Sequence, residues 1–257
     1  MEVCCVDLGL HAMKMVSLLL GAAALACYTL TVKGIYLPGV APKEFAIGQR
    51  VEMKVNKLMS TRTHLGYNNY DLAFCQPESG VKAAAENLGE HLTGDTIENT
   101  PYMLEMRINK TCQVLCAPRT LSSDEVTAFT EKIDEEYYVN WIVDNLPVAA
   151  VGVTLDDSVL YSHGFPVGLK EVDGTYELMT HARIVIFYHT SPDYEGSRIV
   201  GAEAIPLSVK QTVESKDGAT TLQDCPTNTG YTVDAEVSPM QIAGPSVTAP
   251  VSVTWSY

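Results

Sequence analysis

The sequence is short of positive charge, with 17 Lys and Arg against 31 Asp and Glu and a formal net charge of −14. A chain of this charge repels phosphate backbones and anionic lipid surfaces. Nucleic acid is therefore not an expected partner. Charged residues of both signs make up only 19% of the chain and hydrophobic residues make up 46%, which predicts a packed core and not a disordered chain.

The sequence also lacks the short motifs of common enzymes. It contains no P-loop, no G-x-S-x-G nucleophile elbow, no H-E-x-x-H metal helix and no G-x-G-x-x-G dinucleotide turn. A secreted glycoside hydrolase needs only two carboxylates placed by the fold, so a motif search does not exclude one. A solvated helix end and a charged turn explain the acidic clusters more simply, and no catalytic residue and no cofactor are expected. The acids concerned are Asp134, Glu135, Glu136, Asp156 and Asp157.

The histidines do not have the spacing of a metal site. His181 and His189 lie on one face of the expected strand HARIVIFYH. Eight steps of about 3.3 Å place them about 26 Å apart, too far to share an ion. His163, in the turn SHGFP, has no partner in the local sequence. No metal site is predicted, and the three residues are interpreted as surface or turn histidines.

Only one uncharged run is long enough to suggest targeting. Eighteen residues without charge, MVSLLLGAAALACYTLTV, lie between Lys14 and Lys33. A membrane-spanning helix needs about 20 residues, whereas a secretory signal has an apolar core of about 7–15. Residues 1–34 are therefore predicted to be a signal peptide, with a retained signal anchor as the alternative. Cleavage sites with small residues end at Ala26 and at Gly34.

Seven cysteines are present, and an even four of them follow the predicted signal peptide. An even number in an oxidising compartment is typical of structural disulfides, and four cysteines allow three pairings. The C-x3-C spacing of one pair differs from the C-x2-C of zinc ribbons and thioredoxin-like sites. The four are therefore disulfide candidates: Cys75, Cys112, Cys116 and Cys225.

The chain after the leader is predicted to be mostly β. Strict alternation of apolar and polar residues predicts half-buried strands in RVEMKVNK, YMLEMRI and VSVTWSY. HARIVIFYH and SRIVGAEAIPLSV add two apolar strands around the turn-rich TSPDYEG. The residues expected on the buried faces of the alternating strands are Val51, Met53 and Val55, then Tyr102, Leu104, Met106 and Ile108, then Val251, Val253, Trp255 and Tyr257.

One helix is predicted in SSDEVTAFTEKIDEEYY. Ser122 and Glu125 have the capping-box order, and acids fill the first turn. VKAAAENLGEHL is a second and weaker candidate, because Gly89 lowers its helical propensity. We therefore expect an all-β fold, an antiparallel β-sandwich with one or two short helices packed on it, as a single domain over residues 35–257. The apolar stripe of the first helix is Val126, Phe129, Ile133 and Tyr137.

The stretch YVNWIVDNLPVA interrupts an apolar strand with Asn140, Asp144 and Asn145 before Pro147. These side chains either form a binding cluster or bond to local backbone groups where a strand ends. Asn and Asp are well suited to the second role because they cap and turn the backbone. Capping and turn formation are the preferred interpretation.

Two further features concern sugars. Asn109 begins the sequon Asn-Lys-Thr and is a candidate N-glycosylation site in a translocated protein. Sandwiches with aromatic residues on one face often bind carbohydrate, which makes a secreted carbohydrate-binding module the alternative function. Core packing is the competing interpretation of both tryptophans. The candidate platform residues are Tyr67, Tyr70, Trp141 and Trp255.

Many segments, in one order from Ile35 to Tyr257, closely resemble the lumenal domain of the nonaspanins, the transmembrane-9 superfamily or endomembrane protein 70 family. The resemblance is specific because it consists of several long motifs in register. It covers IYLPGVAPKEF, GQRVEMKVNKLMS, YNNYDLAFCQP, ENLGEHLTGD, EMRINKTCQVLC, YVNWIVDNLPVA, HGFPVGL, ARIVIFYH and RIVGAEAIPLSVK.

The resemblance implies a lumenal domain without enzymatic activity, in Golgi or endosomal membranes, that takes part in trafficking and surface delivery of other membrane proteins. It implies signal cleavage near Gly34 and supports a structural role for the four cysteines. The family continues into nine membrane spans, so a chain ending at Tyr257 is expected to be truncated before the membrane domain. The implied partners are that membrane domain and membrane-protein cargo, with no nucleic acid and no small-molecule substrate.

Overall fold

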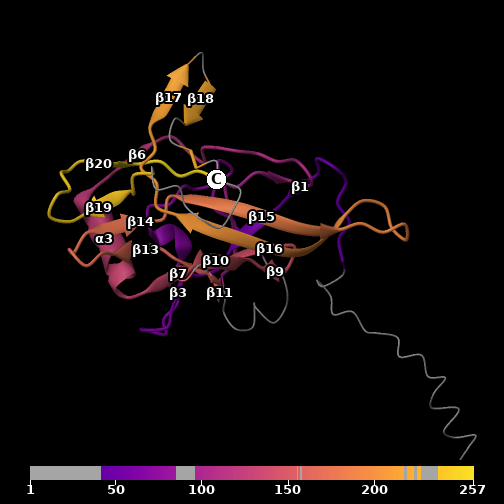
Figure 1. The fold of residues 1–257 in the computed structure, drawn as a ribbon, viewed down its shortest axis with the longest axis horizontal. Coiled ribbons are helices and arrows are strands. Elements are labelled where there is room, and N and C mark those ends of the chain that lie inside the picture. The colour runs from indigo at the N-terminus through magenta and orange to yellow at the C-terminus, as the bar shows by residue number, and fades with distance from the viewer. Residues whose placement is uncertain are drawn as a thin grey trace, which may run out of the picture. The chain divides into compact units, whose positions relative to one another are not determined.

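Strands dominate the computed structural model, which describes residues 42–84, 96–154, 156, 158–216, 219–222, 225–226 and 237–257 (Figure 1). These residues all fall within one unit of the chain, Gly39–Tyr257. The predicted signal peptide, residues 1–34, lies outside the described residues. Within the described ranges, no helix combines the length and the apolar character needed to cross a bilayer.

The strands are short, apart from β15 and β16. In chain order they are β1 (Arg50–Val51), β2 (Met53–Val55), β3 (Met59–Ser60), β4 (Glu98–Asn99), β5 (Leu104–Glu105), β6 (Arg119–Leu121), β7 (Tyr137–Val139), β8 (Trp141–Val143), β9 (Leu146–Pro147), β10 (Ala149–Val153), β11 (Val159–His163), β12 (Phe165–Pro166), β13 (Gly168–Lys170), β14 (Tyr176–Leu178), β15 (His181–His189), β16 (Arg198–Leu207), β17 (Val213–Lys216), β18 (Ala219–Leu222), β19 (Gln241–Ala243) and β20 (Val251–Val253).

The sheets of the described chain are small and mostly antiparallel. Two have four strands, in the orders β11-β10-β16-β15 and β4-β2-β8-β9. Two have three strands, β12-β7-β3 and β13-β14-β19, and the pairs β1-β5, β17-β18 and β20-β6 complete the set. The short pairing of β10 with β16 is parallel. The mainly β class, with several mostly antiparallel sheets and a short helix, is confirmed.

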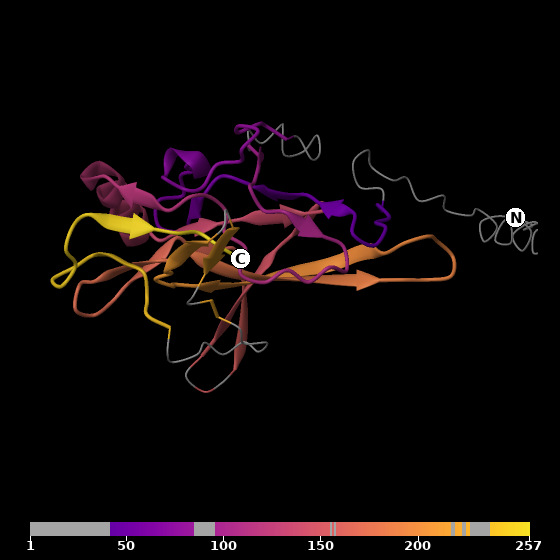
Figure 2. The same cartoon turned by 90° about the horizontal axis from the view of Figure 1, so that it is seen from above.

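One main core lies between these sheets. Figure 2 shows the N-terminal strands and the long β15–β16 hairpin in separate layers. The alternating face of β1 and β2 is buried as expected, with Val51, Met53 and Val55 each at most 2% exposed. Val253 is also fully buried. The two strands predicted on either side of TSPDYEG are β15 and β16, paired in one antiparallel hairpin.

The strand predicted over YMLEMRI is shorter than expected. Only β5 pairs there, and Arg107 has a left-handed backbone with φ 62°. The turn at Arg107 directs the chain away from the sheet, so Ile108 is 44% exposed while Met106 is 1% exposed. The expectation that Ile108 shares the buried face is therefore wrong.

The predicted helix is present as α3 (Ser123–Asp134), with Ser122 as its N-cap and a complete capping box with Glu125. Phe129 and Ile133 are buried against the core, as the stripe predicts. Tyr137 is also buried, but it lies in a strand and not in the helix. Glu136 has a left-handed backbone that ends the helical path, and pairing with β3 and β12 makes Tyr137 the first residue of β7.

The second helix candidate falls mainly outside the described residues. The candidate VKAAAENLGEHL covers residues 81–92, and residues 85–95 are not described. The part that is described, Val81–Ala84, is not helical, and Ala83 forms an antiparallel bridge with Glu98.

Replacing Ser122 by alanine is expected to destabilise the domain by about 1 kcal/mol. The Ser122 hydroxyl accepts from the backbone N–H of Glu125 at 3.3 Å, and the Glu125 carboxylate accepts from the backbone N–H of Ser122 at 2.8 Å. Ser123→Ala, one position on, keeps this cap and is the matched control. Equal losses for both variants in urea unfolding would contradict a role for the cap.

Candidate functional site

The polar residues of YVNWIVDNLPVA form a turn and not a binding cluster. β8 and β9 pair with Val143 opposite Leu146, which leaves Asp144 and Asn145 as a two-residue loop. Both have positive φ, 49° and 61°, as a type I′ hairpin turn requires. The Asn140 side chain donates to the Tyr138 carbonyl at 3.4 Å. Local backbone geometry therefore accounts for these residues.

The tryptophans proposed as a sugar platform lie in the core. Trp141 is 6% exposed and Trp255 is 4% exposed. The Trp141 ring packs edge to face on Tyr102 at 4.8 Å and on Phe165 at 4.6 Å between ring centroids. A sugar needs an exposed aromatic face, so the tryptophan platform is contradicted. The other two candidates, Tyr67 and Tyr70, are partly buried against the same core.

The acids considered for hydrolysis are engaged in local structure. Asp134 ends α3 and accepts from Lys170 and from the Tyr176 hydroxyl, both at 2.8 Å. These hydrogen bonds lower the pKa of Asp134. Hydrogen bonds from Thr154 and Ser158 likewise lower the pKa of Asp156. A glycosidase general acid needs a raised pKa, so neither group suits that role.

The remaining acids that the structure describes also have local structural roles. Glu135 forms a salt bridge with Lys132, and Glu136 has a positive φ in the turn after α3. Asp157 lies outside the described residues. The described ranges contain no group of three or more His, Cys, Asp and Glu side chains that could hold a metal ion.

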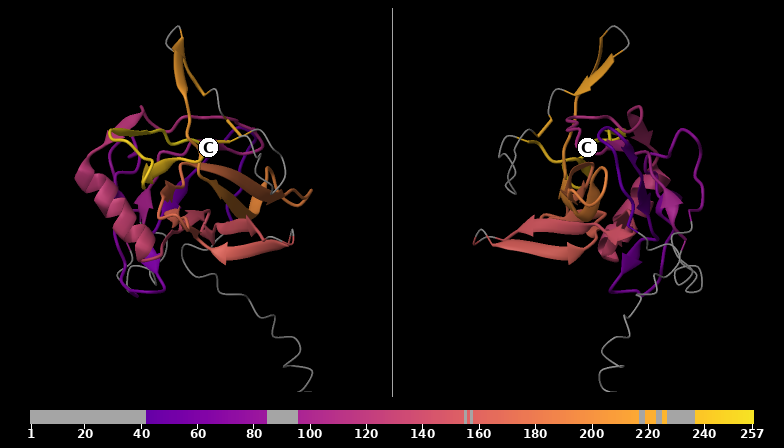
Figure 3. Two further views of the ribbon diagram at one scale, coloured as in Figure 1. Left: turned by 60° about the vertical axis from the view of Figure 1, so that its left-hand side comes forward. Right: turned by 90° about the vertical axis from the view of Figure 1, so that its right-hand side faces the viewer.

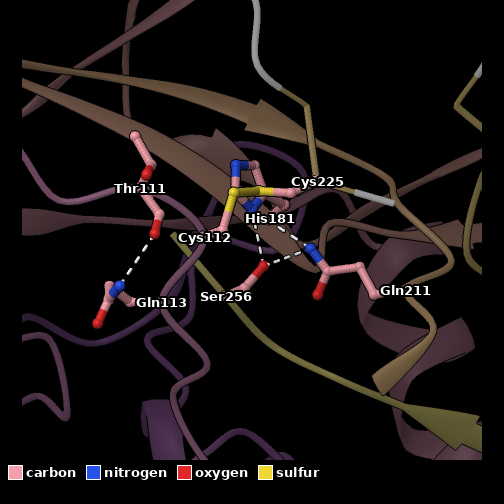
Figure 4. Close-up of a disulfide and its surroundings, with 7 residues drawn as sticks. All are labelled: Thr111, Cys112, Gln113, His181, Gln211, Cys225 and Ser256. Atoms are coloured by element: carbon pink, nitrogen blue, oxygen red, sulfur yellow. Dashed lines mark hydrogen bonds between the residues drawn. A yellow bond between two sulfur atoms is a disulfide. The ribbon is translucent and has the colours of Figure 1, made fainter. Parts of the chain in front are cut away.

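Two disulfides join the four candidate cysteines. Cys75 is bonded to Cys116, 41 residues away, and Cys112 is bonded to Cys225, 113 residues away. The first bond fastens the loop after η1 (Asn69–Asp71) to the segment before β6. The second joins the loop after β5 to a segment that follows β18, next to His181 in Figure 4.

The candidate functional site is a groove of about 490 Å³ beside this second disulfide. One wall is the outer side of β15, and the other is the chain from β5 to Cys112. Cys225, Pro226 and Tyr257 lie at its margin. No single motif marked this groove in the sequence, because it joins segments that are far apart along the chain. Its walls contain Leu104, Met106, Ile108, Ile184, Val185, Ile186 and Tyr188.

The rim of the groove is more basic than the chain as a whole. Arg107, Lys110 and Arg183 line it, against the single acid Glu105. Lys110 bridges Glu105 at 2.7 Å and also donates to the Met103 carbonyl. The Arg107 guanidinium lies over the Tyr188 ring, 5.4 Å from its centroid. The groove therefore combines an apolar floor with a local excess of positive charge.

The C-terminal residues hold the two walls of the groove in place. One wall is the chain that follows β5, and the other is the strand β15. Tyr257 exchanges two backbone hydrogen bonds with Gln113, and its hydroxyl donates to the Met103 carbonyl at 3.0 Å. Ser256 forms a parallel bridge with His181 at the start of β15. These contacts fix the separation of the two walls.

His181 is a buried member of this network, which corrects its interpretation as a surface or turn histidine. It is 5% exposed, and its Nδ1 lies 2.7 Å from the Ser256 hydroxyl (Figure 4). The Gln211 side-chain amide donates to the same hydroxyl, so Ser256 links the imidazole of His181 to Gln211. Burial, with a smaller contribution from Arg183, lowers the pKa of His181 from 6.5 to about 4.

Acidification is therefore expected to destabilise the domain through His181. Between the unfolded pKa of 6.5 and the folded pKa of about 4, the unfolded chain binds the proton and the folded chain does not. The contribution is fully present above pH 6.5 and is lost as the pH falls through this interval, about 3 kcal/mol in total.

The measurement compares urea unfolding of wild type and His181→Gln at pH 7 and pH 4.5. The wild type should lose more stability than the variant, because other titrating groups contribute equally to both. Parallel losses would contradict the assignment. His189→Gln is the matched control, since His189 lies at the exposed end of β15 and contacts Tyr194.

The remaining sequence candidates are at the surface. Asn109 is exposed and lies on the rim of the groove. A glycan at Asn109 stays a prediction. His163 is also exposed, at the end of β11.

Comparison with known proteins gives consistent matches. The family model Endomembrane protein 70 matches residues 66–257. The chain is 41% identical over 219 residues to Transmembrane 9 superfamily member 10 of Arabidopsis thaliana, covering 82% of this chain and 34% of that protein. It is 40% identical over 205 residues to Transmembrane 9 superfamily member 4 of Homo sapiens, covering 73% and 31%. The chain thus spans about a third of the length of these relatives. No solved structure matches it.

Proposed function

Because the chain belongs to the endomembrane protein 70 family, the transmembrane 9 superfamily, we propose that residues 35–257 form the lumenal domain of a multi-spanning membrane protein. The domain has no enzymatic activity. The protein takes part in sorting other membrane proteins and in their localisation to membranes, within the Golgi and endosomes.

The groove beside β15 carries this proposal. Its apolar floor and basic rim suit a segment that is itself apolar and acidic, in a chain whose net charge of −14 otherwise repels acidic partners. The segment belongs to the protein's own membrane domain or to a membrane-protein cargo. A small-molecule substrate and nucleic acid are not part of the proposal.

The contact is tested with a photo-crosslinking amino acid in place of Ile108, which is 44% exposed on the groove wall. The chain is expressed in the secretory pathway and irradiated in intact membranes. Integral membrane proteins should be crosslinked, and charge reversal by Arg107→Glu in the same chain should abolish the products. The same crosslinker at Val172, which is fully exposed, is the control.

Products that appear equally from Val172, that survive Arg107→Glu, or that contain only soluble proteins would contradict a groove contact. Turnover of glycosides by the purified chain would contradict the non-enzymatic proposal.

Lumenal exposure predicts that the chain carries a glycan at Asn109. An endoglycosidase should increase the gel mobility of the wild type and leave Asn109→Gln unchanged. Thr111→Ser preserves the sequon and should remain glycosylated, while Thr111→Ala should not. A wild-type chain without glycan in a cell that glycosylates other lumenal proteins would contradict exposure of this site.

A further inference from the structure

The groove beside β15 also contains the edge of a sheet. β15 is the outermost strand of the sheet β11-β10-β16-β15, and no other described strand pairs with its outer side. In both views of Figure 3 the C-terminal end of the chain and the salmon β10–β11 hairpin lie on opposite sides of the orange β15–β16 hairpin. Ser256 is the one described residue that bridges to this side of β15, at His181. Among the described residues, the edge is therefore paired at the start of β15 and unpaired along the groove.

The bridge to Ser256 shows which backbone groups of β15 point into the groove. Ala182 donates its N–H to the Ser256 carbonyl at 3.3 Å. Pro206, which has no N–H, lies opposite Ala182 on β16, as expected where a pair is not hydrogen-bonded. Backbone groups point to alternate sides along a strand, so the N–H and C=O groups of Ile184 and Ile186 are also directed toward the groove.

The side chains along this edge define which strand would fit there. Ile184 and Ile186 lie on one face of β15 and pack against the main core, whereas Arg183 and Val185 lie on the other face. A residue of an added strand shares a face with the β15 residue opposite to it. A complementary strand therefore places apolar side chains opposite Ile184 and Ile186, with a carboxylate between them on the face of Arg183.

We propose that an extended lumenal segment of a cargo membrane protein adds to the outer edge of β15 as a further strand. The segment has apolar residues at alternate positions and an acidic residue between them. Its backbone exchanges hydrogen bonds with Ile184 and Ile186, and its side chains occupy the groove. The inference rests on the proposed function and adds to it the binding mode and the chemistry of the occupant.

Charge and backbone recognition together favour this occupant. Three basic side chains line the groove against the single acid Glu105, which Lys110 already bridges, so an acidic strand is attracted. The net charge of −14 opposes association with a second copy of this chain. Main-chain hydrogen bonds accept many sequences, as a domain that sorts several membrane proteins requires. A fixed contact with the protein's own membrane domain has no such requirement.

The first test is a titration of the secreted chain with the peptide acetyl-Ser-Thr-Val-Asp-Val-Thr-Ser-amide, followed by hydrogen exchange. Protection of the Ile184 and Ile186 amides should rise with peptide concentration, whereas the Val185 amide, which points to β16, should not change. N-methylation of the three central residues of the peptide removes N–H donors and keeps its charge. It should weaken binding at least about ten-fold, and so should lysine in place of the aspartate.

A variant of the chain tests the same hydrogen bonds from the other side. Ile186→Pro removes an outward N–H and keeps the bonds to β16, and an edge strand tolerates proline when its N–H faces outward. This variant should bind the peptide at least about ten-fold more weakly than the wild type. Ile186→Ala keeps the N–H and is the matched control, which should bind more tightly than the proline variant. If the proline variant does not fold, the N-methylated peptide gives the same test on the wild type.

Failure of this inference differs from failure of the proposed function. An N-methylated peptide that binds as tightly as its parent, or protection that spares Ile184 and Ile186, would overturn strand addition. Crosslinking of membrane proteins from Ile108 would then still support the groove contact. Absence of that crosslinking would overturn both. Crosslinks from Ile108 to the membrane domain of a full-length family member, and not to other membrane proteins, would overturn the cargo as occupant.

Discussion

Replacing Trp141 by alanine is expected to lower the free energy of unfolding by about 3–5 kcal/mol. The side chain is 6% exposed and contacts Tyr102 and Phe165 in edge-to-face geometry. Its removal loses the transfer free energy of a large apolar group, leaves a cavity in the main core and removes two aromatic pairs. The measurement is equilibrium unfolding in urea.

Two variants separate cavity formation from a general effect of losing an aromatic ring. Trp141→Phe keeps a ring in the cluster and should cost clearly less than the alanine variant. Phe187→Ala removes a ring that is 42% exposed on β15 and should cost less than about 1 kcal/mol. A Trp141→Ala protein as stable as Phe187→Ala would show that Trp141 is not a core residue.

Removing the Cys112–Cys225 disulfide is expected to cost about 3–5 kcal/mol. The bond closes the longer of the two disulfide loops, 113 residues against 41. In the chain-entropy account, a longer loop loses more freedom in the unfolded state when it is closed. The double variant Cys112→Ser and Cys225→Ser should show this loss in urea unfolding.

The control is Gln113→Ala, which changes an exposed neighbour of Cys112 and should have an effect within about 0.5 kcal/mol. The double variant should also disturb the groove, because the disulfide holds the end of one wall beside β15. A loss of less than about 1 kcal/mol would mean that this bond contributes little to the folded domain.

The sequence predicted those parts of the fold that depend on local pattern. β15 and β16 carry long apolar runs around a turn-rich segment, and α3 has a capping box at its start. The burial of β2 follows directly from its period of two. In each case neighbouring residues determine the structure, so a short window of sequence is sufficient.

Other features depend on contacts between distant segments and could not be read in this way. Tyr137 continues the helical stripe in sequence, yet pairing with β3 and β12 places it in β7. Ile108 fits the alternation of its strand, but the left-handed backbone at Arg107 exposes it. Four cysteines indicated disulfides without giving their pairing, which depends on where the fold brings the segments together.

The candidate groove was hidden from the sequence for the same reason. Its walls come from β15 and from the chain between β5 and Cys112, and Ser256 reaches His181 from the far end of the sequence. The only local signal near it was the sequon at Asn109. The burial of His181 could not be inferred from its strand alone, because Gln211 and Ser256 cover it from other parts of the chain.

The proposed lumenal domain requires an oxidising compartment, in which the bonds Cys75–Cys116 and Cys112–Cys225 form. Peptide mapping of the secreted protein under non-reducing conditions, after alkylation of accessible thiols, tests it most directly. We expect linked peptides for Cys75 with Cys116 and for Cys112 with Cys225, with no alkylation at these four positions. Four alkylated cysteines, or a bond between Cys112 and Cys116, would contradict it.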